Sequence, residues 1–273
     1  LPTFCAFILG FIIPFIMGIW LSFCKFTTVT DAKFVGFSNY KKAFEDTVFR
    51  HSFWYTALFA VASLIIINAV AFALASALTK NMRGTNIFRT IFFMPNLIGG
   101  ILLGFTWQFI FVSIFEAIGK NTGMTWLQGW LSDQKTGFIG MLIVLTWQLA
   151  GYMMIIYIAG LQNVPDDLIE AAEIDGANKI QTLFKVTIPM MMPSITICMF
   201  LSITNGFKLF DQNLSLTAGG PANSTEMIAL NIYNTAFKES KLGQAQAKAV
   251  VFLIVVVVIS VTQLILSKRK EVE

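Results

Sequence analysis

Five carboxylate side chains fall within ten residues of an otherwise apolar chain, inside the stretch "NVPDDLIEAAEIDGA". They belong to Asp166, Asp167, Glu170, Glu173 and Asp175. Clustered carboxylates can serve acid–base catalysis or bind a metal ion, but such sites need a histidine or a nucleophile nearby, and none stands here. Two interpretations remain open. The patch is either a solvated acidic face, or a set of acceptors for the arginines and backbone amides of a partner.

Polar and aromatic side chains inside two apolar stretches form a second candidate site. These stretches contain "TWQLAGY" and "SITNGFKLFDQN". Polar groups within membrane spans are costly and are often functional. Aromatic faces suit the C–H surface of a sugar, whereas amides and hydroxyls suit its hydroxyl groups. The alternative is that the aromatic side chains pack in the core or anchor at an interface, while the small polar ones bond between helices.

The composition points to a chain that lies in a bilayer. Of its 273 residues, 56% are hydrophobic and 12% are charged, whereas a soluble domain carries about a quarter charged residues. The mean hydropathy is +0.72. Six stretches reach the roughly 20 apolar residues that a span needs. They cover residues 4–23, 54–79, 91–112, 138–161, 190–210 and 245–267. We therefore predict an all-α integral membrane protein with about six transmembrane helices, the first of them a true span.

Several classes of function are disfavoured. The formal charge of +4 is spread along the chain and forms no basic cluster for nucleic acid. The spacing of Cys5, Cys24 and Cys198 fits neither a disulfide framework nor a zinc site, so we predict no metal. No phosphate-binding G-x-x-x-x-G-K-[ST] loop is present. The chain is therefore not expected to hydrolyse ATP or to act as an enzyme.

The acidic stretch reads as two short helices joined by a turn. Pro165 suits a first helical position, and the acids that follow it complement the positive end of a helix. Gly176 is a helix stop and Asn178 a cap for a second helix. Ile169, Ala172 and Gly176 share one side. Pro189 then resets the chain before the fifth span.

"EAAEIDGA", followed by "VTIP" ten residues after its glycine, resembles the EAA motif of ATP-binding-cassette importer permeases. Ile188 stands where that family usually has leucine. "FVGFSNYKKAFED", "RTIFFMPNLIGGILLGFTWQFIF", "NVPDDLIEAA" and "LTAGGPANSTE" look like the maltose-type, carbohydrate-uptake branch. The resemblance implies one permease domain over residues 1–273 with the MetI-like core of type I importers. Its core would span 54–267, the first span 4–23 would be peripheral, and 165–187 would be the coupling region.

The resemblance also implies roles for individual residues. The acidic helix would dock in a groove of a separate ATPase subunit. The ATPase-coupling residues would be Glu170, Ala171, Ala172, Asp175, Gly176, Ala177 and Pro189. The substrate-binding residues would be Trp147, Gln148, Tyr152, Ser202, Asn205 and Gly206.

The implied assembly has several partners. They are a second permease subunit, usually of different sequence, two ATP-binding subunits, an external solute-binding protein, a sugar and membrane lipid. ATP and Mg would be held by the ATPase, and this chain itself would carry no cofactor.

Charge alone leaves the orientation open. With both termini in the cytoplasm, the inner segments hold eight lysines and arginines and the outer loops eleven, against the positive-inside tendency. The density of positive charge in "KNMRGTNIFR" and "SKRK", beside helix ends, supports that orientation. The EAA motif has to face the cytoplasm, so we predict a bacterial cell-membrane protein with both termini inside.

Three rival interpretations remain. The same machine could carry a glycerol-phosphate-type solute, with Lys208 pairing with the phosphate. The chain could be an ion-coupled secondary carrier, although inverted repeats and a buried acid–base chain are missing from the sequence. A membrane scaffold without transport is the third.

Overall fold

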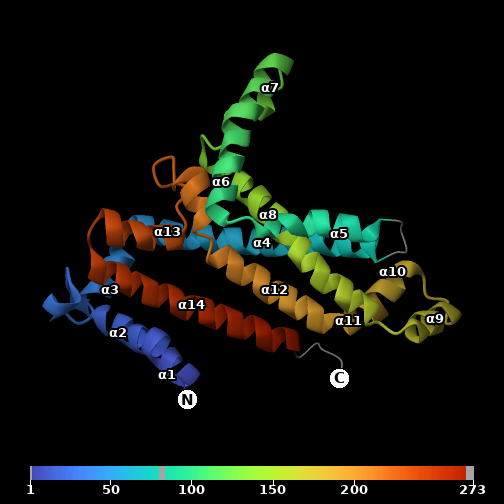
Figure 1. Cartoon of the computed structure of the whole chain (residues 1–273), viewed down its shortest axis with the longest axis horizontal. Helices are drawn as coiled ribbons and strands as arrows, with labels where there is room; N and C mark the ends of the chain where they lie inside the picture. Colours follow the sequence, from blue (N-terminus) through green and yellow to red (C-terminus); the bar gives the residue numbers. More distant parts are fainter. Residues whose placement is uncertain (1, 80–83, 269–273) are drawn as a thin grey trace.

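Helices make up most of the described chain (Figure 1). The structure is a computed structural model and describes residues 2–79 and 84–268. The α-helices are α1 (Pro2–Phe7), α2 (Ile13–Leu21), α3 (Ser38–Glu45), α4 (Thr47–Leu78), α5 (Thr85–Phe93), α6 (Gly100–Phe109), α7 (Phe115–Thr122), α8 (Gln134–Gln162), α9 (Asp166–Ile174), α10 (Lys179–Thr182), α11 (Ile188–Met190), α12 (Met192–Phe207), α13 (Ile228–Tyr233) and α14 (Leu242–Lys268). Short 3₁₀ turns are η2 (Val29–Asp31), η3 (Met94–Leu97) and η5 (Thr125–Leu127). The described chain also contains the π-helical segments η1 (Ile8–Ile12), η4 (Ile110–Ile114), η6 (Leu183–Thr187), η7 (Asn213–Thr217) and η8 (Asn234–Lys238).

One small sheet accompanies the helices in the described ranges. β1 (Cys24–Lys25) pairs antiparallel with β2 (Lys33–Phe34). The basic residues Lys80, Arg83, Arg269 and Lys270, used above to judge orientation, lie outside the described residues.

The centre of the molecule is built by α4, α8 and α12. Their facing sides supply the large buried side chains, such as Phe59, Ile67 and Met153. Small residues let the helices approach closely: a Cβ on Gly206 would lie 2.7 Å from the Ser63 Oγ. The core is therefore closed by packing between helices, as is usual where lipid rather than water surrounds the bundle.

Five described helical segments are long and apolar enough to cross a membrane, or six if a bent pair counts as one span. They are Pro2–Leu21, Thr47–Leu78, Gly100–Thr122, Gln134–Gln162 and Leu242–Lys268, with Lys179–Met190 plus Met192–Phe207 as the bent pair. The predicted all-α membrane class is confirmed. The second and fourth spans begin earlier than expected because Asp46 and Asp133 cap them, each accepting hydrogen bonds from two backbone amides.

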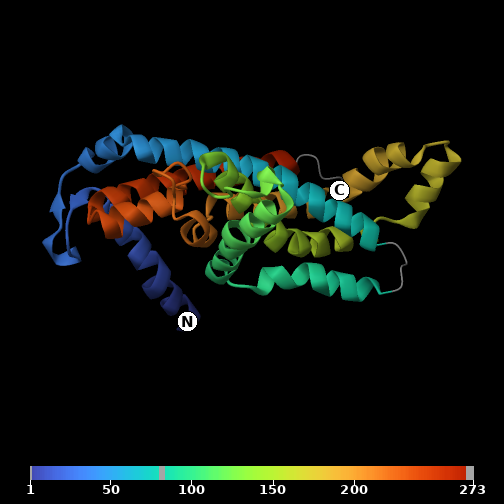
Figure 2. The same ribbon diagram turned by 90° about the horizontal axis from the view of Figure 1, so that it is seen from above.

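The bounds predicted for the third span, 91–112, differ from those of the described spanning segment, which is Gly100–Thr122. α5 ends at Phe93, η3 ends at Leu97, and Ile98 is extended before α6 begins at Gly100. Pro95 cannot donate a backbone hydrogen bond, so the α-helix ends before it and a single 3₁₀ turn follows. α5 lies along the central helices, whereas α6 and α7 project away from them (Figures 1 and 2).

The end of α5 crosses α8 at Gly151, where a Cβ would lie 1.8 Å from the Phe92 carbonyl oxygen. We expect Gly151→Ala to destabilise the fold by about 1–3 kcal/mol, the usual cost of overpacking. Thermal unfolding of the purified chain in detergent measures this. Gly10→Ala is the matched control, because nothing lies within 4 Å of a Cβ there. Equal melting temperatures for the two variants would contradict the prediction.

Candidate functional site

The acidic stretch forms two short helices outside the bundle, at the end opposite the β-hairpin (Figure 1). Pro165 is the N-cap of α9 rather than its first helical residue. Gly176 ends α9 with φ +82°, and two hydrogen bonds close the turn: Gly176 N–H to the Glu173 carbonyl at 3.0 Å and Ala177 N–H to the Ala172 carbonyl at 2.9 Å. This is the left-handed helix stop that glycine adopts most readily.

α10 begins at a cap, as the sequence predicts. The Asn178 side chain accepts from the Ile180 and Gln181 amides, and the Gln181 side chain accepts from the Asn178 amide at 2.8 Å. η6 and α11, which contains Pro189, then lead into α12. The axis bends by 75° between Met190 and Met192. Two caps and a bend therefore fix the shape of this loop locally.

The predicted coupling residues divide between two sides of the loop. Glu170, Ala171, Asp175 and Gly176 are exposed, whereas Ala172, Ala177 and Pro189 are half-buried. A group of apolar side chains at the tip of this loop was not predicted from the sequence. Leu168, Ile174, Ile180 and Phe184 are exposed, Ile174 by 85%. The i, i+4 spacing of Ile180 and Phe184 could have predicted that they share one face of a helix.

A polar cavity of about 310 Å³ lies between α8, the break after η3 and the end of α12. Gln148 and Asn205 of the predicted substrate set are in its wall, together with the Lys208 of the rival interpretation. Asn96, Asp211 and Gln212 complete the polar lining. Asn96 was not predicted, although an asparagine directly after a helix-breaking proline was a usable signal.

Gln148 connects three segments at this cavity. Its Oε1 accepts a hydrogen bond from the Gln212 Nε2 at 2.5 Å, and its Nε2 donates to the Ile98 carbonyl at 3.1 Å. The break in the third span thus supplies a backbone acceptor that an intact helix would have used internally. The cavity exists because the helix is interrupted there.

Other predicted substrate residues lie away from this cavity. Ser202 and Gly206 are buried against α4, where the Ser202 Oγ accepts from the Asn68 Nδ2 at 3.0 Å. Tyr157, which was not predicted, donates to the Asn68 Oδ1 at 2.6 Å. Ser202 and Gly206 therefore hold helices together in this structure and form no part of the cavity wall.

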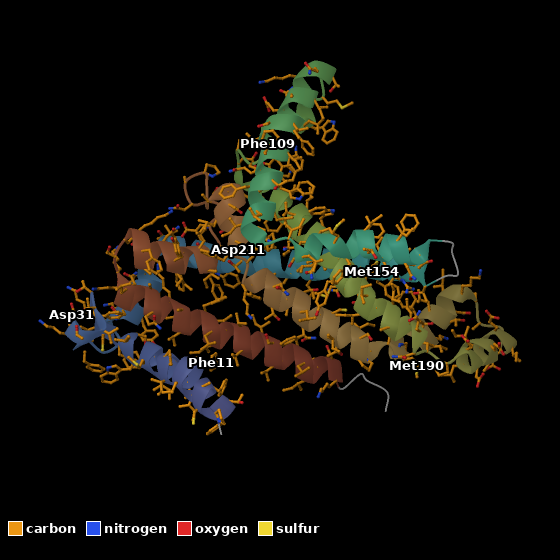
Figure 3. All side chains as sticks on the ribbon, viewed as in Figure 1. Phe11, Asp31, Phe109, Met154, Met190 and Asp211 are labelled. Atoms are coloured by element: carbon orange, nitrogen blue, oxygen red, sulfur yellow. The ribbon has the colours of Figure 1, made fainter. Side chains whose placement is uncertain are left out.

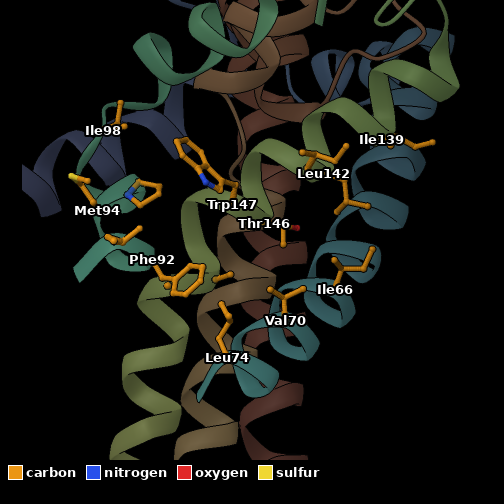
Figure 4. Close-up of a pocket in the computed structure, with 15 residues that line it drawn as sticks. Ile66, Val70, Leu74, Phe92, Met94, Ile98, Ile139, Leu142, Thr146 and Trp147 are labelled. Carbon is orange, nitrogen blue, oxygen red and sulfur yellow. The ribbon is translucent and has the colours of Figure 1, made fainter. Parts of the chain in front are cut away.

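Trp147 and Tyr152 belong to a different environment. Trp147 lines an apolar cavity of about 830 Å³ between α4, α5 and α8 (Figure 4). Its ring lies 5.5 Å from that of Trp107. Tyr152 packs against Phe93 with ring centroids 6.4 Å apart. Neither aromatic face is presented to the polar cavity.

The loop of α9 and α10 is joined to the polar cavity by helices. α8 carries Gln148 and ends just before α9, and α12 follows α11 and carries Asn205. α12 has 16 residues, which corresponds to a length of about 24 Å. A displacement of α9 and α10 would therefore reach the cavity through two continuous helices.

A bundle of membrane helices, an interrupted span beside a polar cavity, and a capped helical loop outside the bundle define a membrane permease. The chain belongs to the family described as binding-protein-dependent transport system inner membrane component, whose profile matches residues 69–272.

Several relatives match along nearly the whole chain. A probable starch degradation products transport system permease protein of Thermoanaerobacterium thermosulfurigenes is 47% identical over 272 residues, 100% of this chain and 93% of the relative. A multiple sugar-binding transport system permease protein of Streptococcus mutans is 33% identical, over 96% of this chain and 91% of the relative. A solved bacterial ABC transporter involved in alginate import has the same fold, with a TM-score of 0.83 at 19% identity, covering 98% of this chain and 93% of its own.

Proposed function

We propose that this chain is the permease subunit of an ATP-driven importer for a sugar or oligosaccharide, and that the polar cavity is part of its path. The observation that carries the proposal is the set of amide side chains gathered at that cavity among membrane helices. Amides both donate to and accept from hydroxyl groups. The names of the two relatives, which concern starch degradation products and multiple sugars, support the same class of solute.

The charges in the cavity wall favour a neutral solute. Lys208 and Asp211 are both exposed in it, so a cation is accompanied by a carboxylate. A phosphate group would gain from Lys208 but be repelled by Asp211. The glycerol-phosphate alternative rests on Lys208. It is also supported by relatives such as a sn-glycerol-3-phosphate transport system permease protein of Agrobacterium fabrum, which is 28% identical over 85% of this chain.

In the complex that we propose, a second permease chain covers the face of the molecule on which the polar cavity opens. Asn205, Lys208 and Asp211 are exposed at the end of a membrane helix, where contact with lipid would be costly. A partner subunit facing them would enclose the solute path between two chains. The two ATP-binding subunits, with their ATP and Mg, would then lie against α9 and α10 in the cytoplasm. This orientation places both termini inside and the solute-binding protein outside.

Transport then follows from two packings of the same helices. ATP binding would move the coupling loops, and α8 and α12 would carry that movement to Gln148 and Asn205. Each ligand shifts the balance only if it binds one packing better than the other. The Gln148–Gln212 hydrogen bond would be made in one packing and broken in the other.

Uptake by the reconstituted complex tests this function. We expect transport to need ATP and the binding protein, and Gln148→Ala with Asn205→Ala to lower it about tenfold or more, because each lost hydrogen bond costs roughly 1 kcal/mol. Asn121→Ala is the matched control, since Asn121 is exposed on α7 and lies outside the cavity wall.

Two outcomes would count against the proposal. Uptake driven by an ion gradient alone would favour a secondary carrier. Normal uptake by the double variant would remove the cavity from the path.

A further inference from the structure

A cavity lined in part by charged side chains lies at the end of the molecule opposite α9 and α10, between the β-hairpin, α3 and the start of α14. Its volume is about 760 Å³. Four lysines, Lys25, Lys33, Lys42 and Lys241, line it with a single carboxylate, that of Asp31. Figure 1 shows the hairpin and α3 at the same end of the molecule as the start of α14, and Figure 3 labels Asp31 there. The cavity wall therefore carries an excess of positive charge.

The four lysines differ in their surroundings, because Lys42 and Lys241 also line a neighbouring cavity that contains carboxylates, whereas Lys25 and Lys33 do not. Lys25 and Lys33 stand directly opposite each other in the hairpin register, and like charges in that arrangement destabilise a strand pair. Within the described ranges, no carboxylate lies within 4.0 Å of the ammonium groups of Lys25, Lys33 or Lys42. Lys241 is paired with Glu239 at 2.8 Å.

Asp31 offsets one of the four positive charges but forms no ion pair with any of these lysines. Its Oδ1 accepts from the Thr27 and Thr28 amides, both at 2.9 Å, and its Oδ2 accepts from the Thr27 hydroxyl. The carboxylate is thus engaged in holding the turn between the strands. The start of α14 adds to the positive potential, because Leu242, Gly243 and Gln244 are its first residues and lie in the wall. Amides of a first helical turn have no acceptor within the helix and favour anions.

The surroundings of the cavity match the edge of a bilayer. α2 ends where α14 begins, and the two helices touch at Gly18 and Gln246. Further along, both helices present exposed apolar side chains, including Ile16 and Val258. Trp20 is exposed and stacks on Phe34 at 5.6 Å. Aromatic side chains of this kind gather at the level of lipid headgroups.

We propose that this cavity binds the anionic phosphate headgroup of a phospholipid, with its acyl chains along the apolar faces of α2 and α14. The lysines supply the charge and the helices supply the apolar surface, so the site fits an amphiphile better than a soluble anion. This inference goes beyond the transport function and depends only on α2 and α14 crossing the membrane. It also gives a physical role to lysines that the positive-inside tendency leaves unexplained.

Lipid binding to the full chain in a neutral detergent tests the site. The probes are phosphatidylglycerol and phosphatidylcholine with the same acyl chains, titrated and followed by native mass spectrometry. Wild type is expected to prefer phosphatidylglycerol. Lys25→Gln, Lys33→Gln and Lys42→Gln should each weaken its binding about fivefold, which corresponds to the contribution of one lysine near an anionic surface. The three variants are measured singly, so the result does not depend on a triple variant folding.

Controls separate this site from general charge effects. Lys41→Gln, Lys120→Gln and Lys135→Gln remove exposed lysines outside the cavity wall and should leave binding unchanged. Lys33→Arg should retain it. Without lipid, Lys33→Gln should be no less stable than wild type, because it removes a like-charge pair.

Three results would overturn the proposal. One is equal affinity of wild type and the three cavity variants for phosphatidylglycerol. Another is displacement of the lipid by inorganic phosphate at equal concentration, which would assign the site to a soluble anion. The third is unchanged lipid affinity combined with lost docking of the solute-binding protein, which would assign the lysines to a protein partner.

Discussion

Replacing Gly176 by valine is expected to abolish ATP-driven uptake while the chain still inserts in the membrane. Gly176 has φ +82°, and its amide and that of Ala177 bond back to the last turn of α9. A β-branched residue in this conformation costs at least about 1–2 kcal/mol. The angle between α9 and α10 would change, and with it the surface offered to an ATPase. We expect uptake to fall about a hundredfold or more, since a misplaced coupling element affects every transport cycle.

A second glycine gives the matched control. Gly123 ends α7 with φ +74° and, as at Gly176, a Cβ added there would have no other atom within 4 Å. Gly123→Val therefore introduces similar backbone strain far from the coupling loop, and uptake should survive it. Co-purification of the ATPase subunits and uptake into proteoliposomes are measured for both variants. Normal uptake with Gly176→Val, or equal loss with both variants, would exclude the coupling role.

Lys248→Met is expected to have the largest effect on stability. The Lys248 ammonium is fully buried and donates to the Asp46 Oδ2 at 2.7 Å, the Asn231 Oδ1 at 2.8 Å and the Thr235 Oγ1 at 2.7 Å. These contacts connect α14 with the start of α4, α13 and η8. Breaking a buried pair typically costs about 3–5 kcal/mol. Because the Asp46 side chain is 23% exposed, we expect a loss near the lower end of that range.

The same pair predicts an acid-sensitive component of stability. Burial by itself would raise the pKa of the Asp46 carboxyl, but the hydrogen bond and charge of Lys248, with the Phe49 and Val48 amides, hold the pKa below its usual 3.8. A depressed carboxyl pKa stabilises the fold above the unfolded-state value, and the contribution is lost as pH falls through the folded-state pKa. Wild type should therefore lose stability below about pH 4.

Thermal melting against pH distinguishes this pair from general acid effects. Asp46→Asn should remove most of the acid-sensitive component attributed to the pair. Lys41→Met is the matched control, because Lys41 is exposed and its ammonium lies 3.9 Å from the Glu45 carboxylate in an i, i+4 pair. An exposed pair of this kind contributes at most about a few tenths of a kcal/mol to stability. A Lys248→Met protein that melts like the Lys41→Met protein would refute the role assigned to the buried ammonium.

The conformation of the loop formed by α9 and α10 is the part of the candidate site that the sequence predicts best. Its signals are local: acids after a proline, a glycine after the last helical turn, and an asparagine three residues before a glutamine. Each acts on backbone groups within a few residues, so no distant contact is needed to form the two caps seen in the structure. The apolar tip at Ile174, Ile180 and Phe184 was not predicted. These side chains stand out only because nothing in the described chain covers them, and exposure can be seen only in the folded structure.

The polar cavity could be predicted only in part. Asn205 and Ser202 stand three residues apart on α12, yet Asn205 reaches the cavity and Ser202 bonds to Asn68 on α4. Helical spacing gives the angle between two side chains around the helix axis. It does not give the rotation of the whole helix about that axis, which decides what each side chain faces. That rotation depends on which neighbour packs against the helix, and here small residues such as Gly206 bring α4 and α12 together.

Composition predicts the bilayer environment and most of the spans, and short-range signals predict the capped loop of α9 and α10. The family was predicted from the resemblance of its motifs. The spans and the caps depend on composition or on contacts between near neighbours in the chain. Only long-range packing brings Gln148 beside the break of the third span, gathers Asn96, Asp211 and Gln212, and buries Lys248 against Asp46. These features join residues far apart in sequence, and their free energies arise from packing and desolvation in three dimensions, which no local pattern contains.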